Sequence, residues 1–237
     1  MTAVPLDHLA ALAVAQDAYL GLLADADPEA AVPTCGDWRV ADLTAHLAGV
    51  HWWAAAMALG LDLDAEPSAG PRDVPALVRV YAWAASHLRG TLAELDPASP
   101  ALTLLGPGPA GFWRRRQLHE TLVHLTDLAV ALGVADAADL DPVWWADTVD
   151  EVVTVTQPRQ VRLGRMRALD AGVHWSATDT GDDWLLGPAD AVAATVRGPA
   201  RELALTLWGR VQPTDPRLRV DGDAGALARV LAEPLTP

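Results

Sequence analysis

Apolar residues recur every three to four positions through roughly the first two thirds of the chain, which is the pattern of helices with a buried face. Asp37 and Asp73 are plausible N-caps for two of these helices, and Gly133 is a natural stop for a third. Pro and Gly break the segment 97–111, which we interpret as a loop. The pattern predicts helices over 6–24, 37–60, 73–95, 112–132 and from 142 to near 158.

The pattern changes after residue 157. Alternating and short apolar runs predict strands over 174–179, 184–186, 191–196 and 218–220. Two more helices are expected over 199–208 and 224–231. The chain is therefore expected to be an α+β protein of two domains, with an all-α domain over 1–157 and a small α+β domain over 158–237.

Composition narrows the range of partners. The formal net charge of −14 over 237 residues disfavours binding to phosphate backbones, so no nucleic acid partner is expected. No apolar run reaches the length of a membrane span, and the first residues lack the basic region of a secretory signal. The single cysteine, Cys35, permits no intrachain disulfide and has no histidine or arginine adjacent in sequence. We expect a cytoplasmic protein that does not bind membranes, in which Cys35 is a small structural residue.

Candidate metal ligands lie on two of the predicted helices. Glu120 and His124 are four residues apart, so their side chains leave the same face of one helix, and His46 lies on another helix. Their neighbours are apolar, and a buried carboxylate without a partner is costly. Two imidazoles and a carboxylate suit zinc and leave a coordination position open. Asp127 is placed to orient an imidazole. Spacing alone leaves the alternative that these are ordinary hydrogen-bonding side chains.

Two segments, 36–47 and 112–127, resemble the signatures of the mycothiol-dependent maleylpyruvate isomerase-like family, within the wider DinB/YfiT-like superfamily. The tail is similar too, at 195–200, 207–210 and 221–223. The resemblance implies an N-terminal DinB-like four-helix bundle and a divalent metal, usually zinc, held by His46, Glu120 and His124. It also implies mycothiol as a thiol cofactor whose sulfur takes the open position.

The implied chemistry is addition of a metal-activated thiolate to a small electrophile, as an isomerase or as an S-transferase. Partners would then be a low-molecular-weight thiol and a small-molecule electrophile, on a monomer or a homodimer. Two alternatives use the same fold. One is a non-catalytic binding or regulatory module, and the other is a metal-dependent hydrolase using zinc-bound water.

Two arginines are candidates for catalysis. The default interpretation of the run 114–116 is a solvated turn or one that forms salt bridges between the domains. Arg116 lies one turn before Glu120 on the same face, so it could instead pair with Glu120 or point toward the cavity. Arg210 matches an arginine of the family and is a candidate for binding a carboxylate of the substrate or cofactor. Pairing between the domains is the competing interpretation for Arg210.

The aromatic and remaining histidine side chains add one candidate. Trp53 follows His46 by about two turns and is expected to line a cofactor pocket, although core packing is the default for tryptophan. His51 and His119 lie off the helix faces that carry the proposed ligands, so neither is expected to bind the metal.

Overall fold

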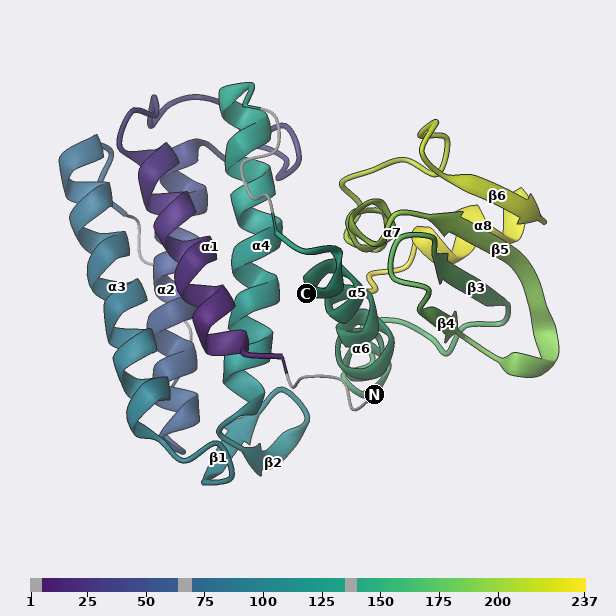
Figure 1. Ribbon diagram of the computed structural model, residues 1–237, viewed down its shortest axis with the longest axis horizontal. Coiled ribbons are helices and arrows are strands. Elements are labelled where there is room, and N and C mark those ends of the chain that lie inside the picture. Colours follow the sequence, from purple (N-terminus) through teal and green to yellow (C-terminus); the bar gives the residue numbers. More distant parts are fainter. Residues whose placement is uncertain (1–5, 64–69, 135–139) are drawn as a thin grey trace. The chain divides into compact units, whose positions relative to one another are not determined.

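A computed structural model describes residues 6–63, 70–134 and 140–237, and the chain divides into two compact units, Met1–Asp139 and Leu140–Pro237 (Figure 1). The division lies earlier in the chain than the boundary expected after residue 157. The physical reason is that helix α5 (Pro142–Glu151) packs against α7 (Ala200–Leu207), so it belongs with the second unit.

Four helices form the bundle of the first unit: α1 (His8–Leu23), α2 (Val40–Ala58), α3 (Val74–Glu94) and α4 (Phe112–Leu132). Helices α1 and α2 each pack against both α3 and α4. Tyr19 and Tyr81 lie fully buried in the core, with their ring centroids 4.5 Å apart. The mainly helical first unit expected from the periodicity is therefore present, and α4 has the predicted bounds.

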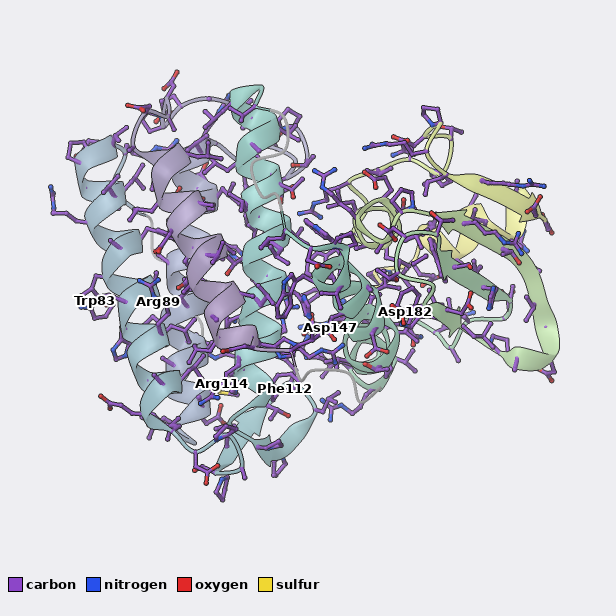
Figure 2. The ribbon with its side chains drawn as sticks, viewed as in Figure 1. Trp83, Arg89, Phe112, Arg114, Asp147 and Asp182 are labelled. Atoms are coloured by element: carbon purple, nitrogen blue, oxygen red, sulfur yellow. The ribbon has the colours of Figure 1, made fainter. Side chains whose placement is uncertain are left out.

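Polar side chains connect the outer faces of these helices. Arg89 on α3 pairs with Asp17 on α1 at 3.0 Å (Figure 2).

Within the described residues, no helix combines the length and apolar character needed to cross a membrane.

The helix ends follow the sequence signals with one exception. Asp73 caps α3 by accepting from the Ala76 amide at 3.0 Å, and Gly133 ends α4 with a left-handed φ of 66°. Helix α2 begins at Val40, not at Asp37 as predicted, because residues 31–39 form a closed loop bridged at Ala31 and Arg39. The prediction of Asp37 as an N-cap was wrong.

A hairpin that the sequence did not predict connects α3 to α4. Strand β1 (Pro100–Thr103) pairs antiparallel with β2 (Gly106–Pro109), and proline is tolerated because both strands are edge strands. Arg114 donates to the carbonyls of Leu92 and Leu95 at the end of α3 (Figure 2). This arginine therefore fastens the start of α4 to α3 and is not a solvated turn residue.

The second unit contains the expected α+β arrangement. Its strands are β3 (Gly172–Ala177), β4 (Asp183–Leu186), β5 (Val192–Gly198) and β6 (Arg219–Gly222). They form a sheet of order β4-β3-β5-β6, in which only the β3–β5 pair is parallel. Val173 and Trp175 of β3 and Val196 of β5 are fully buried. Its helical elements are α5, η1 (Val152–Thr156, a π-helical turn), α6 (Gln157–Arg162), η2 (Ala189–Ala191), α7 and α8 (Ala224–Leu231).

Candidate metal centre

Three side chains from two packed helices converge inside the first unit. His46 comes from α2, and Glu120 and His124 come from consecutive turns of α4. One ligand atom of each residue lies within 4.8 Å of the other two. Oε1 of Glu120 is 3.4 Å from Nε2 of His46 and 3.3 Å from Nε2 of His124. The packing of α2 on α4 thus brings together residues that are 74 positions apart.

These distances fit a small divalent cation. Ligand atoms held about 2.0–2.1 Å from a tetrahedral zinc ion lie about 3.3–3.4 Å from one another. The two distances from Oε1 of Glu120 already have that value. The His46 and His124 rings are nearly perpendicular, at 84°, with their centroids 5.1 Å apart. Two neutral imidazoles and one carboxylate are also the donor set that zinc accepts, with one position left for another ligand.

The second oxygen of Glu120 is held by an arginine one turn earlier. Nη2 of Arg116 donates to Oε2 of Glu120, which leaves Oε1 for the histidines. Burial raises the pKa of Glu120, but the charge of Arg116 and the hydrogen bonds with His124 and His46 together hold it well below its ordinary value. Among the sequence interpretations for Arg116, pairing with Glu120 is the one observed. The carboxylate is therefore ionised and ready to bind a cation.

His124 is held from its other ring nitrogen. Nδ1 of His124 donates to Oδ2 of Asp127 at 2.9 Å, and the thiol of Cys35 donates to the same oxygen at 3.3 Å. Burial lowers the pKa of His124, but its hydrogen bonds with Asp127, Cys35 and Glu120 raise it well above its ordinary value. These contacts favour a proton on Nε2, so a metal that binds there competes with a proton.

His46 is the most accessible of the three side chains. It is 32% exposed, against 10% for Glu120 and 7% for His124. The ring of Trp38 lies beside it, with a centroid distance of 4.9 Å. A molecule that approaches the centre from solvent therefore meets His46 and Trp38 first.

A separate buried network lies one turn along α4 from the centre. Nδ1 of His51 donates to Oε1 of Gln117 at 2.8 Å, and the amide of Gln16 donates to Nε2 of His51 at 3.1 Å. Burial lowers the pKa of His51 to about 4. His51 is therefore a neutral core histidine that joins α2 to α1 and α4.

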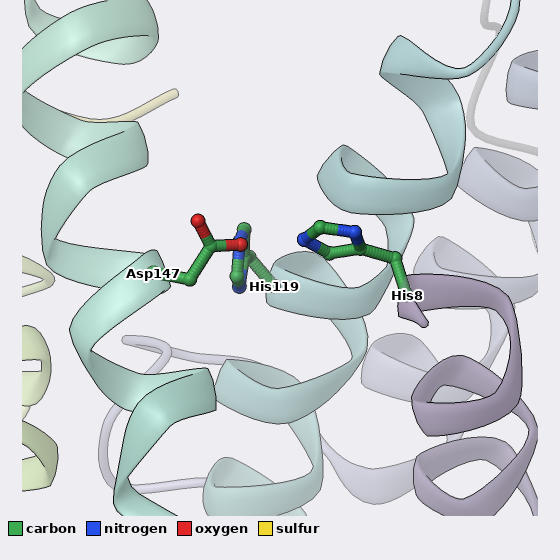
Figure 3. A group of neighbouring side chains, drawn as sticks. All are labelled: His8, His119 and Asp147. Carbon is green, nitrogen blue, oxygen red and sulfur yellow. The ribbon is translucent and has the colours of Figure 1, made fainter. Parts of the chain in front are cut away.

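The other histidine expected to lie off the ligand face, His119, packs edge-on against His8 of α1. Their ring centroids are 6.3 Å apart with an interplanar angle of 88° (Figure 3). His119 is fully buried and comes from the turn of α4 before His124.

The two remaining predicted residues lie elsewhere. Trp53 packs edge-on against Trp113 at 5.1 Å and donates to the carbonyl of Leu63 at 2.9 Å. Arg210 belongs to the second unit, where it follows α7 and donates to the carbonyl of Trp208 at 2.7 Å. These contacts give both residues a local packing role, and their binding roles stay predictions.

Sequence reasoning missed two side chains beside the proposed centre: one touches the ligand His46, and the other touches Asp127, which holds His124. Cys35 contacts Asp127, and Trp38 contacts His46, both from the loop that precedes α2. The only sequence signal was their position within the segment 32–38 that leads into the helix carrying His46. The absence of a sequence neighbour for Cys35 was misleading, because its neighbours come from α4.

Comparison with protein families gives two adjacent matches. The profile of the mycothiol maleylpyruvate isomerase N-terminal domain matches residues 9–129, and that of the MDMPI C-terminal domain matches residues 143–229. No curated protein matches the chain.

Two solved structures have the same fold. They are crystal structures of the mycothiol-dependent maleylpyruvate isomerase and of a histidine-to-alanine mutant of it. The mutant has 15% sequence identity and a TM-score of 0.71, and the other structure has 16% and 0.69. Each match covers 93% of this chain and 95% of the other. At these identities the likeness establishes the shared fold over both units.

Proposed function

The chain belongs to the mycothiol maleylpyruvate isomerase family, and we propose that it is a metal-dependent enzyme that uses mycothiol to isomerise a small electrophile of the maleylpyruvate kind. The observation that supports this most is the convergence of His46, Glu120 and His124, whose ligand atoms lie within 4.8 Å of one another. Zinc is the ion that best suits this donor set.

In this proposal the residues of the chain hold and tune the ion. His46 and His124 each contribute Nε2, and Glu120 contributes Oε1. Arg116 keeps the other carboxylate oxygen engaged, which favours binding through one oxygen. Asp127 keeps a proton on Nδ1 of His124, so that Nε2 faces the centre. A bound divalent ion would lower the pKa of a coordinated thiol enough for a thiolate to form near neutral pH.

The accessible side of the centre is where the thiol and substrate would enter. His46 is the ligand nearest to solvent, and Trp38 flanks it. We propose that Arg210 binds a carboxylate of the substrate or cofactor, because a guanidinium engages a carboxylate with two parallel hydrogen bonds. Trp53 stays a predicted member of the cofactor pocket.

Metal analysis tests the centre directly. Purified protein reconstituted with zinc should hold about one ion per chain, and His46→Ala, Glu120→Ala and His124→Ala should each bind it much more weakly. His87→Gln is a matched control, because His87 is an exposed histidine stacked on Trp83 of α3. Zinc retained in all three variants would disprove the proposed ligand set.

Thiol dependence is a separate question. Mycothiol should bind the zinc-loaded protein in calorimetry and should not bind the His124→Ala variant. If zinc binds but millimolar mycothiol does not, the result favours the metal-dependent hydrolase. A zinc-loaded protein that shows no turnover would favour the non-catalytic binding module.

Product analysis separates the isomerase from the S-transferase. An isomerase converts a cis substrate to its trans isomer and returns the thiol, so a small amount of mycothiol supports many turnovers. An S-transferase releases the adduct and consumes one thiol for each substrate. Mass spectrometry of the thiol pool after complete conversion distinguishes these outcomes.

A further inference from the structure

A second set of donor atoms lies on the opposite edge of the His124 ring. Cys35, His124 and Asp127 each offer one ligand atom, and these three atoms lie within 4.8 Å of one another. Oδ2 of Asp127 is 2.9 Å from Nδ1 of His124 and 3.3 Å from Sγ of Cys35. Thiolate, imidazole and carboxylate together form a softer set than the one at Nε2.

The loop before α2 holds Cys35 in this position. The amide of Cys35 donates to the Val32 carbonyl at 2.9 Å, and the amide of Trp38 donates to the Cys35 carbonyl at 3.3 Å. Gly36 adopts a left-handed φ of 63°, which an L side chain rarely adopts, and so permits the tight turn. The backbone of this loop thus holds the Cys35 thiol against α4.

Charge balance favours replacing protons by a cation at this place. The thiol of Cys35 and Nδ1–H of His124 both donate to one oxygen of the fully buried Asp127. A divalent cation that displaces these two protons to solvent leaves the total charge of the cluster unchanged. The usual penalty for burying additional charge therefore does not arise.

We propose that Cys35, Asp127 and Nδ1 of His124 form a second cation site, suited to a soft divalent ion such as cadmium. Zinc-like geometry, with bonds of about 2.3 Å to sulfur and about 2.0–2.2 Å to nitrogen and oxygen, needs donor separations of about 3.3–3.6 Å. The two separations measured from Oδ2 of Asp127, 2.9 Å and 3.3 Å, open to those values with shifts of about 0.3–0.5 Å.

The second site competes with the proposed metal centre, because both use the same imidazole. Occupancy of both nitrogens would remove a second proton from His124 and place two cations on one ring. Each site also has two residues that the other does not use. They are His46 and Glu120 at the proposed metal centre, and Cys35 and Asp127 at the second site. A single substitution can therefore remove either set and leave the other complete.

Cadmium titration of the metal-free full chain in thiol-free buffer tests the proposal. Cys35 is the only cysteine, so any thiolate-to-cadmium charge-transfer absorption reports this residue. The His46→Ala variant should develop the absorption and saturate at one cadmium per chain. Cys35→Ser should lose it but keep its zinc at the proposed centre. Asp127→Asn and His124→Ala should weaken the titration strongly.

Two results would overturn the second site. One is the absence of charge-transfer absorption in a folded His46→Ala protein, with folding checked by circular dichroism. The other is absorption in Asp127→Asn and His124→Ala that titrates as in His46→Ala, since Cys35 would then bind cadmium alone. Competition has its own test, because zinc-loaded wild type should need more cadmium than His46→Ala for the same absorption. The cadmium absorption of His46→Ala tests the second site, whereas its zinc content tests the proposed metal centre. Failure of one proposal can therefore be distinguished from failure of the other.

Discussion

Asp127 accepts a hydrogen bond from Nδ1 of His124 at 2.9 Å while its own side chain is completely buried. The two residues are three positions apart on α4, so the helix itself sets this contact. A carboxylate in this position fixes the ring orientation and strengthens the basicity of the opposite nitrogen. Nε2 of His124 is thereby aimed at Glu120 and His46.

Asp127→Asn should weaken zinc binding about 10–100-fold, because the amide keeps the shape of the side chain but loses its charge. Competition with a chelating dye measures this affinity. Thr126→Val is the matched control, because the Thr126 hydroxyl donates to the Leu122 carbonyl in the same turn of α4. Equal affinity in Asp127→Asn and wild type would show that the contact does not tune the centre.

Arg116→Met should destabilise the metal-free protein by about 3–5 kcal/mol, because it removes the guanidinium that pairs with the buried Glu120 carboxylate and leaves only the two histidines beside it. Zinc should recover part of that loss, since a cation supplies the missing positive charge and binding to the folded state adds stability. Urea unfolding with and without zinc measures both the loss of unfolding free energy and its recovery by zinc. A loss that is the same in both conditions would mean that Arg116 acts through packing and not through the charge of Glu120.

His51 should make the metal-free protein less stable at acidic pH. Its pKa is about 4 in the folded chain, against an ordinary value near 6.5. Between these values the unfolded state binds more protons, so stability falls as the pH falls from about 6.5 to about 4, by roughly 3 kcal/mol in total.

Urea unfolding of metal-free wild type and His51→Gln across this pH range isolates the contribution, because the acidic residues titrate alike in both proteins. Glutamine keeps a donor and an acceptor for Gln16 and Gln117 but cannot be protonated. The variant should therefore show a shallower fall of stability at acidic pH. Parallel curves for the two proteins would contradict the assignment of the slope to His51.

Local sequence patterns were sufficient for most elements but not for the surroundings of the centre. The periodicity of apolar residues predicts helix α4, and the glycine at position 133 predicts its end. Both signals are carried by residues that are close together in the sequence. The hairpin β1–β2 gave no strand signal, because its sequence is rich in Pro and Gly and its strands pair only with each other. Predictions were thus reliable where neighbours in sequence decide the structure.

Contacts across the bundle explain what the sequence could not reveal. The i,i+4 pair of Glu120 and His124 was visible in the sequence, but its distance from His46 depends on how α2 packs on α4. Cys35 reaches Asp127 across 92 positions, and no spacing rule connects a loop residue with a helix so far away. The ligand residue types were therefore predictable, and the side chains that tune them were not.

Gly70→Ala should destabilise the first unit by about 1–3 kcal/mol through overpacking. A Cβ at Gly70 would lie 2.5 Å from Cβ of Ala45, the residue before His46 on α2. Ala45→Gly should remove this clash, although it costs about 1 kcal/mol by itself as a helix-interior glycine. In a double-mutant cycle the two changes should therefore cost less together than the sum of their separate costs, and strict additivity would refute the close contact.

Arg210→Lys should raise the KM for a carboxylate-bearing substrate about 10–100-fold and change kcat much less. Lysine keeps the charge but lacks the planar fork that binds a carboxylate through two hydrogen bonds, and hydrogen bonds to charged groups contribute about 1.5–3 kcal/mol. Arg219→Lys is the matched control, because Arg219 is an exposed arginine of the same unit that pairs with Asp221. For a substrate ester, which lacks the carboxylate charge, wild type and Arg210→Lys should have similar KM values. If Arg210 instead serves only local packing with Trp208, unfolding free energy will fall and KM will not change.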